Sequence, residues 1–149
     1  MSSPAVFHPE DLCQILPAPG YYSATVTNAR FRHSSRGNRM LHIVHSLQGV
    51  SAAYQCLADY FVLEGVSPQG LFLARRRLVE LYRACGFLPE EGQEIRPSHL
   101  LEARLQVKVE HEFWNSRPRL RIVGYYPSWP AVLDAPASSG SECEGSPHA

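Results

Sequence analysis

The sequence predicts a mainly β fold, a five-stranded OB-like Greek-key barrel with one helix between strands 3 and 4. Three observations support this prediction: segments of alternating apolar residues, one helix with clear boundaries, and the order of these elements along the 149 residues. Three strands, a helix and two more strands is the chain order of this barrel. Strands are predicted at Tyr21–Phe31, Arg39–Leu47, Ala53–Leu63, Arg104–Glu112 and Arg119–Tyr126, and the helix at Pro68–Cys85.

The first predicted strand alternates with a period of two. Tyr22, Ala24 and Val26 share one face, and serine and threonine occupy the other, as expected of a half-buried strand. Phe31 is out of phase with Val26. This change of phase predicts a bulge near Asn28, which would bend a long strand around a small barrel.

Apolar and aromatic residues occupy both faces of the second and third predicted strands. One face holds Leu41, Ile43, Leu47, Leu57, Phe61 and Leu63, and the other holds Met40, His42, Val44, Tyr54, Tyr60 and Val62. Because both faces are apolar, we expect part of this surface to be covered by another element of the chain.

The predicted helix has a start and a stop signal. Ser67 suits the N-cap, Pro68 suits the first helical position, and Gly86 follows as a C-terminal stop. Apolar residues at helical spacing form one stripe: Leu71, Ala74, Leu78, Leu81, Tyr82 and Cys85. We expect this stripe to close one end of the barrel.

The last two predicted strands have one apolar and one polar face. In the fourth strand Leu105, Val107 and Val109 alternate with polar residues. In the fifth strand Leu120 and Ile122 face inward, which places Arg119, Arg121, Val123 and Tyr125 on the opposite face. The outward side of this hairpin is therefore expected to be rich in arginine.

The chain divides into an N-terminal arm (residues 1–19), an OB-like domain (20–127) and a tail (128–149) that is rich in Pro, Ser, Gly and acidic residues and is expected to be disordered. The net charge of zero hides an uneven distribution. All 14 basic residues lie between positions 21 and 126, against nine acidic residues, and 13 of the 14 are arginine. Arginine suits phosphate, because its planar fork of donors matches the phosphate oxygens.

Several classes of function are not expected. No apolar run approaches the roughly 18 residues of a membrane helix, and the N-terminus lacks the pattern of a signal peptide, so a cytoplasmic protein without a membrane partner is expected. The cysteines and histidines lack metal-ligand spacing. No catalytic motif is present. We therefore expect no enzyme, no catalytic residues, no metal and no cofactor.

Clustered arginine beside aromatic residues points to single-stranded nucleic acid. Binding a single strand requires cations for the phosphates and flat side chains on which bases stack. In the predicted barrel, the loop between strands 1 and 2 and the loop between strands 4 and 5 flank one groove. The candidate binding residues are Arg32, Arg36 and Arg39 in the first loop, Trp114, Arg117, Arg119 and Arg121 in the last hairpin, and Tyr54, Tyr60 and Tyr125 on the sheet. Phe113 and Trp114 could equally close the end of the barrel.

Four short segments carry a resemblance to a family: PGYY at positions 19–22, RGNRML at 36–41, LYRACG at 81–86 and VGYYP at 123–127. With them, residues 17–127 resemble small phage-type single-stranded DNA-binding proteins encoded by phages and prophages. The resemblance implies an OB-fold that coats single-stranded DNA during replication or recombination in the bacterial cytoplasm, without catalysis. The chain departs from the pattern in its single lysine and its neutral charge. It also lacks the acidic and aromatic C-terminal tip of bacterial single-strand binders.

Other interpretations are compatible with the same residues. The barrel could be a protein-interaction module that uses the apolar face of strand three and the tail, which would explain the neutral charge. A replication or recombination protein could be a partner in addition to DNA. RNA could bind the same groove as DNA. A homo-oligomer could form through the outward apolar residues Met40, Val44, Val62 and Val123.

Overall fold

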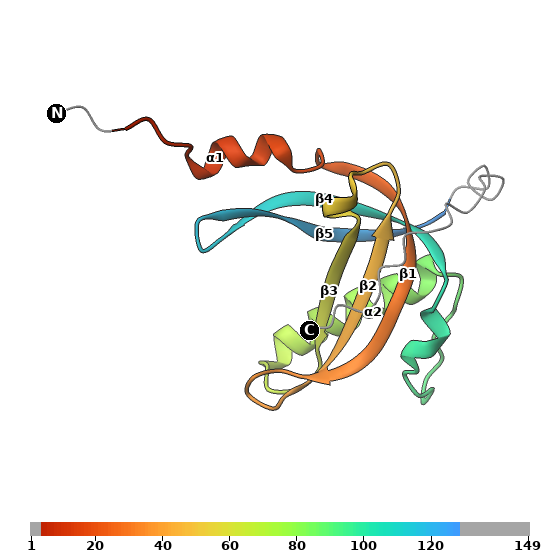
Figure 1. Ribbon diagram of the computed structural model, residues 1–149. Coiled ribbons are helices and arrows are strands. Elements are labelled where there is room, and N and C mark those ends of the chain that lie inside the picture. Colours follow the sequence, from red (N-terminus) through yellow and green to blue (C-terminus); the bar gives the residue numbers. More distant parts are fainter. Residues whose placement is uncertain (1–3, 129–149) are drawn as a thin grey trace.

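The computed structural model describes residues 4–128, so all of the predicted tail except Ser128 lies outside the described residues. Figure 1 shows five strands and one long helix, α2. The strands are β1 (Gly20–His33), β2 (Arg39–Leu47), β3 (Cys56–Val62), β4 (Arg104–Trp114) and β5 (Arg117–Pro127), and the helices are α1 (Pro9–Leu12), η1 (Cys13–Ile15), η2 (Ala52–Tyr54), α2 (Pro68–Ala84) and η3 (Pro97–Leu100). The prediction of a mainly β fold with a helix between strands 3 and 4 is confirmed.

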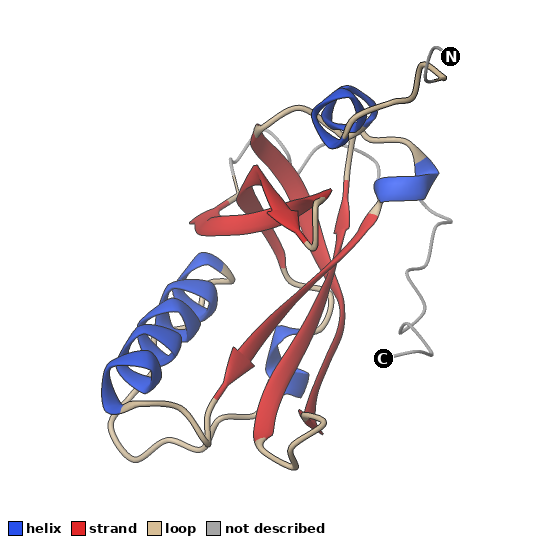
Figure 2. Cartoon of the chain, turned by 90° about the vertical axis from the view of Figure 1, so that its left-hand side faces the viewer, coloured by secondary structure: helices blue, strands red, loops and turns tan. Residues whose placement is uncertain are grey.

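The five strands form one antiparallel sheet in the order β3-β2-β1-β4-β5. β3 and β5 are therefore the two edges of the sheet. β1 pairs with β4 only over Gly20–Thr25 and with β2 over Ala24–His33. The sheet bends strongly along this long strand (Figure 2), and parts of β3 and β5 lie close to each other.

Two bulges set which side chains face inward. In β1 the register shifts between Val26 and Asn28, which confirms the predicted bulge. In the last hairpin Lys108 pairs with Gly124 and Val109 with Ile122, so Val123 is an extra residue. This second bulge reverses the phase of β5, and it turns Tyr125 inward. The prediction that Tyr125 lies on the outward face with Arg119 was wrong for this reason.

Helix α2 spans the gap between the two edge strands. The Ser67 hydroxyl accepts a hydrogen bond from the Gly70 amide at 3.1 Å, and Gly86 follows the helix with φ of +93°, as the capping signals predict. Leu78, Leu81, Tyr82 and Ala84 are buried, and the helix packs on β5 and β3. No helix among residues 4–128 is long and apolar enough to cross a membrane.

β2 lies in the interior of the sheet and is buried on both faces. Leu41 and Ile43 belong to the core, and on the opposite face His42 and Val44 are only 1% and 3% exposed. The sequence suggested that Val44 belongs to an outer surface for oligomerisation. Val44 is too buried to contribute to such a surface. On this opposite face the Tyr60 ring of β3 stacks on His42.

Candidate nucleic-acid interface

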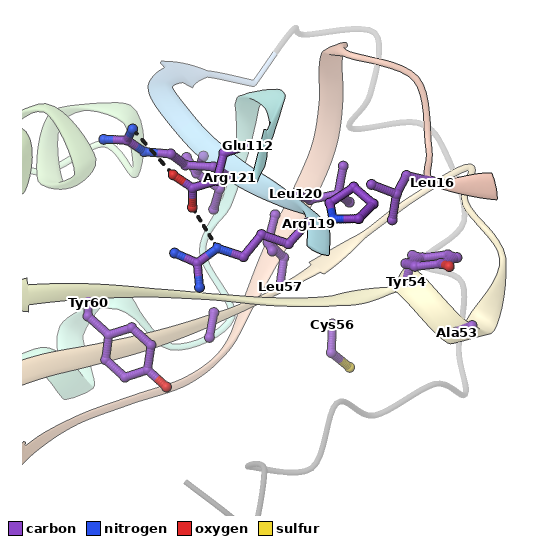
Figure 3. Close-up of a pocket in the computed structure, with 13 residues that line it drawn as sticks. Leu16, Ala53, Tyr54, Cys56, Leu57, Tyr60, Glu112, Arg119, Leu120 and Arg121 are labelled. Atoms are coloured by element: carbon purple, nitrogen blue, oxygen red, sulfur yellow. Dashed lines mark hydrogen bonds and ion pairs between the residues drawn. The ribbon is translucent and has the colours of Figure 1, made fainter. Parts of the chain in front are cut away.

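A groove of about 630 Å³ runs between the two edges of the sheet (Figure 3). One wall comes from η2 and β3, and the other from the end of β4 and the start of β5. Leu16 of the N-terminal arm also lines it. The groove therefore opens between β3 and β5, the two edges of the sheet. In the described part of the chain these two strands do not pair with each other.

Two tyrosines lie along the first wall. Tyr54 belongs to η2 rather than to the strand that the sequence predicted, and its ring is half-buried. Tyr60 is 43% exposed. Its ring stacks on His42 with centroids 4.7 Å apart and an interplanar angle of 20°. One face of the Tyr60 ring is thus fixed against the protein.

The second wall carries two arginines and one carboxylate. Arg119 Nε lies 2.6 Å from Glu112 Oε2, and Arg121 Nη1 lies 3.7 Å from Glu112 Oε1. Both arginines are more than half exposed, so their donors remain accessible from solvent. The carboxylate reduces the positive charge of this wall, an effect that the sequence pattern does not indicate.

The tip of the β4–β5 hairpin projects from the rest of the sheet (Figure 1). Asn115 and Ser116 form its turn with positive φ angles of 50° and 62°. Trp114 is 58% exposed, and the Arg119 guanidinium lies 4.7 Å from its ring centroid. Phe113 is 52% exposed as well. These two rings are too exposed to be part of the core, so the interpretation in which they close one end of the fold is not supported.

The loop between β1 and β2 carries the remaining predicted arginines. Arg36 is exposed beside Gly37, whose φ is +80°. The guanidinium of Arg39 lies 4.0 Å from the centroid of the Phe31 ring, and its amide donates to Glu64 Oε2 at 3.1 Å. This loop does not line the groove. It lies at the opposite end of β3 from the groove wall at η2 (Figure 1).

A row of side chains on the outward face of the sheet connects this loop to the groove. Arg30 of β1 pairs with His42 of β2, which pairs with Tyr60 of β3. Burial lowers the pKa of His42, and the charges of Arg32 and Arg30 lower it further, so the imidazole is neutral near pH 7 and both guanidinium groups act on this face. Sequence reasoning missed Arg30, although it shares the phase of Arg32 in β1.

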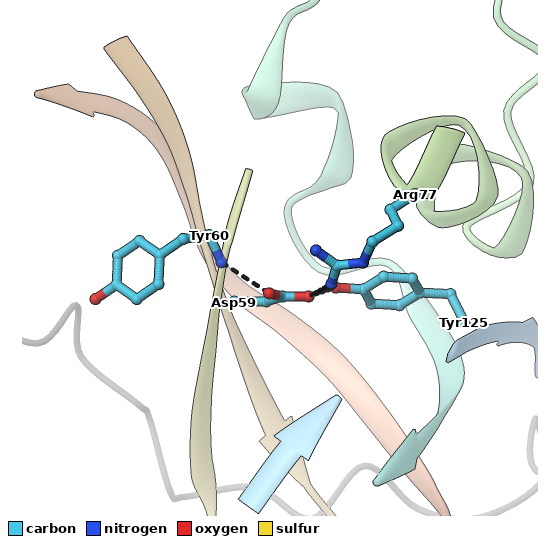
Figure 4. A network of polar contacts seen from close by, with 4 residues as sticks. All are labelled: Asp59, Tyr60, Arg77 and Tyr125. Atoms are coloured by element: carbon cyan, nitrogen blue, oxygen red, sulfur yellow. Dashed lines mark hydrogen bonds and ion pairs between the residues drawn. The ribbon is translucent and has the colours of Figure 1, made fainter. Parts of the chain in front are cut away.

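A polar network lies on the inward side of β3, opposite the Tyr60 ring (Figure 4). Asp59 Oδ2 accepts hydrogen bonds from Arg77 of α2 and from the Tyr125 hydroxyl of β5. Asp59 Oδ1 accepts from the Tyr60 amide at 2.8 Å. Burial raises the pKa of Asp59, against the opposing effect of Arg77, and burial followed by the Asp59 charge raises that of Tyr125 well above 10.

Tyr125 therefore does not present its ring on the outward face, where the sequence predicted it. It is 6% exposed, and its hydroxyl is engaged by Asp59. The network instead ties β3, α2 and β5 together beside the groove. Arg77 and Asp59 give no strong sequence signal, apart from an aspartate in phase with the inward residues Leu57 and Phe61.

The structure thus brings four of the ten predicted residues together in the groove. Tyr54, Tyr60, Arg119 and Arg121 line the groove, Trp114 adjoins it through Arg119, and Arg117 is exposed at the hairpin tip. Arg32, Arg36 and Arg39 lie in or beside the β1–β2 loop. Within residues 4–128, no group of three or more His, Cys, Asp or Glu could hold a metal ion. No family model matches the chain, and a search of curated proteins finds no match.

Proposed function

We propose that this protein binds single-stranded DNA without catalysis and with little sequence preference, in phage or prophage DNA replication or recombination. The observation that carries the proposal is the surface formed by exposed rings and guanidinium groups. It runs from Arg30 and Arg32 across Tyr60 into the groove, and ends at Arg119 and Trp114.

The mechanism combines phosphate neutralisation with base stacking. Arginines at both ends of the surface bind the phosphates, which releases counterions and makes the affinity dependent on salt. The free faces of Tyr60 and Trp114 stack on bases, each contributing roughly 1–3 kcal/mol. Duplex DNA would bind less well, because its bases already stack on one another.

An OB-like barrel is part of the proposal. The strand order places β3 and β5 at the two ends of a bent sheet, and α2 covers the gap between them. In an OB-fold, the face of strands 2 and 3 and the loops between strands 1 and 2 and strands 4 and 5 bind the ligand. Tyr60, Trp114 and the arginines of the two loops occupy these same positions, which supports the proposal.

Fluorescence anisotropy tests the proposal. A labelled dT oligonucleotide of about 30 nucleotides, longer than the site of one OB-fold, is titrated at low and at moderate salt, with duplex DNA as the comparison. We expect saturable binding that weakens with salt and that duplex DNA does not match. Absence of binding at low salt would overturn the proposal. Titration with an RNA oligonucleotide of equal length shows whether the protein prefers DNA or RNA.

A protein-interaction module is the second candidate, and two observations favour it. β3 and β5 are sheet edges, which can pair with an extended segment of another protein. Glu112 also lowers the positive charge of the groove. This candidate predicts no saturable DNA binding at any salt concentration, so the same titration separates the two.

A further inference from the structure

Helix α2 presents a second exposed surface, on the side away from the core. Phe72, Arg76, Val79 and Arg83 follow one another at intervals of four, three and four residues, so they form a single stripe. Phe72 is 64% exposed and Val79 is 43% exposed. Single exposed apolar residues are ordinary, but an apolar stripe along a helix is typical of an interaction surface.

The stripe is positively charged. Arg76 lies 3.9 Å from Glu80, but both side chains are well exposed, at 67% and 48%, so this pair contributes little. Within residues 4–128, Arg83 forms no ion pair, and neither does the neighbouring Arg75. On one side, Glu90, Glu91 and Glu94 share a pocket with Arg75 and Val79 and offset the charge of Arg75. The surface therefore combines aromatic and aliphatic groups with the guanidinium groups of Arg76 and Arg83, which do not line that pocket.

The N-terminal arm has the opposite charge and its own exposed apolar groups. Val6, Phe7 and Ile15 are 66%, 84% and 64% exposed. Glu10 and Asp11 are exposed between them, and residues 4–19 contain no lysine or arginine. The arm thus complements the α2 stripe in charge and shares its apolar character.

The two surfaces lie apart within one molecule. The carbonyl of Pro17 bonds the His111 imidazole at 2.7 Å, and the carbonyl of Ala18 accepts from the Tyr22 hydroxyl at 2.5 Å. These contacts hold the arm beside the β4–β5 hairpin, whereas α2 lies at the other end of the sheet (Figures 1 and 2). We infer that the arm of one copy docks on the α2 stripe of a second copy, with Phe7 against Phe72 and Val79, and with Glu10 and Asp11 facing the arginines.

Such an interface joins two different surfaces, so it does not close on itself in a dimer. Each copy keeps one free arm and one free stripe, and copies add head to tail into open chains. A short arm buries little area, and small interfaces are weak. We therefore expect association in the micromolar range. The inference does not rest on the proposed function, and it is tested without DNA.

Sedimentation velocity over the micromolar range provides the test. The variants are Phe7→Ala in the arm and Phe72→Ala in the helix, two exposed positions at which alanine leaves the core intact. Circular dichroism verifies the fold of both variants. We expect the wild-type protein to form species larger than dimers with increasing concentration, and each variant alone to remain monomeric.

Mixing the variants tests the head-to-tail arrangement. The Phe7→Ala protein keeps its stripe and the Phe72→Ala protein keeps its arm, so the mixture should form 1:1 dimers and nothing larger. A monomeric wild-type protein would overturn the inference. Variants that associate like the wild type, or a mixture that stays monomeric, would overturn it as well.

Discussion

Glu112 is the residue that most limits the positive charge of the groove. Its carboxylate lies 2.6 Å from Arg119 Nε and 3.7 Å from Arg121 Nη1. It occupies the position that a phosphate oxygen would take when a single strand enters. Under the proposed function, DNA therefore competes with this carboxylate for the same donors.

Substitution of this carboxylate tests the competition. In Glu112→Gln the two guanidinium groups become available, so we expect tighter binding of the dT oligonucleotide. The plot of log affinity against log salt should steepen by about 0.7 for each phosphate gained. Anisotropy titrations at several salt concentrations measure both quantities. Weaker binding would instead show that Glu112 holds the arginines in a productive position.

Trp114 should contribute to binding at every salt concentration, because stacking does not depend on counterions. Truncation of one stacked ring costs roughly 1–3 kcal/mol, so Trp114→Ala should weaken binding by about 5- to 150-fold. Phe113→Ala is the matched control, since adjacent strand residues point to opposite faces. Equal losses in both variants would contradict the assignment of Trp114.

Arg36 should act mainly through phosphate charge. It is exposed in the β1–β2 loop, so Arg36→Ala should weaken binding and reduce the salt slope by about 0.7. Arg96→Ala is the control, because Arg96 is exposed, pairs only with Glu94 at 3.2 Å among the described residues, and does not line the groove. A change in slope in the control, or none in Arg36→Ala, would place the DNA elsewhere.

Strand periodicity predicted individual site residues where no bulge intervened. Tyr60, Arg119 and Arg121 have the expected orientation because the alternation of their strands is regular up to those positions. Tyr125 does not, because the extra residue Val123 precedes it. The sequence does not mark this bulge, because only Leu120 and Ile122 define the alternation before it.

At the scale of the elements, the network of Asp59, Arg77 and Tyr125 joins β3, α2 and β5 where no ladder connects the two edges of the described sheet. Asp59→Ala would leave the buried Tyr125 hydroxyl without its acceptor and Arg77 without its counter-charge. The Arg77 side chain is 34% exposed and can be partly resolvated, so we expect a loss of about 2–3 kcal/mol in the free energy of unfolding.

Urea denaturation measures this loss. Glu94→Ala, which removes an exposed pair with Arg96, is the control and should change stability by less than about 0.5 kcal/mol. If the two variants were equally stable, the network would not hold the edges together.

The type and order of the elements were predicted more closely than their boundaries. Helix α2 begins at Pro68 as expected and ends at Ala84, one residue before the predicted end. Its ends were predicted closely because the residues that cap a helix are adjacent to it in the sequence. β2 has the predicted bounds Arg39–Leu47. The third strand begins late, at Cys56, because Ala52–Tyr54 form a turn of 3₁₀-helix. Apolar residues in that turn resemble the start of a strand.

At the scale of the whole molecule, stability should depend on the charge of His45. This residue is 0% exposed, and neither ring nitrogen has a hydrogen-bond partner in the described part of the chain. Burial lowers the pKa of His45 from 6.5 to about 3. The unfolded chain therefore binds a proton in this range that the folded chain does not.

The free energy of unfolding should accordingly be lost as the pH falls from 6.5 toward 3, by up to about 1.4 kcal/mol per pH unit. The raised pKa of Asp59 acts in the opposite direction, since that contribution is lost as the pH rises through its folded value. The difference between wild type and His45→Met, measured by urea denaturation at several pH values, isolates His45. Parallel pH profiles would contradict the assignment.

The sequence predicted the architecture better than it predicted the candidate site. Alternation, caps and element order depend on neighbouring residues, and they predicted the strands and α2. The groove depends on how β3 and η2 meet the hairpin, and the charge balance of that wall depends on Glu112. The first contacts join residues about 60 positions apart, and the second lie across a hairpin. The sequence could therefore indicate clusters of arginine and aromatic residues, but not which residues these side chains contact.

The fluorescence of Trp114 during titration with the dT oligonucleotide tests the central claim most directly. Trp129 is the second tryptophan of the chain, so the experiment uses Trp129→Phe, with Trp114→Phe as the control that reports on Trp129 alone. The account predicts saturable quenching in the first variant, which weakens with salt and matches the anisotropy curve. Binding without any change in Trp114 fluorescence, or no binding at low salt, would contradict it.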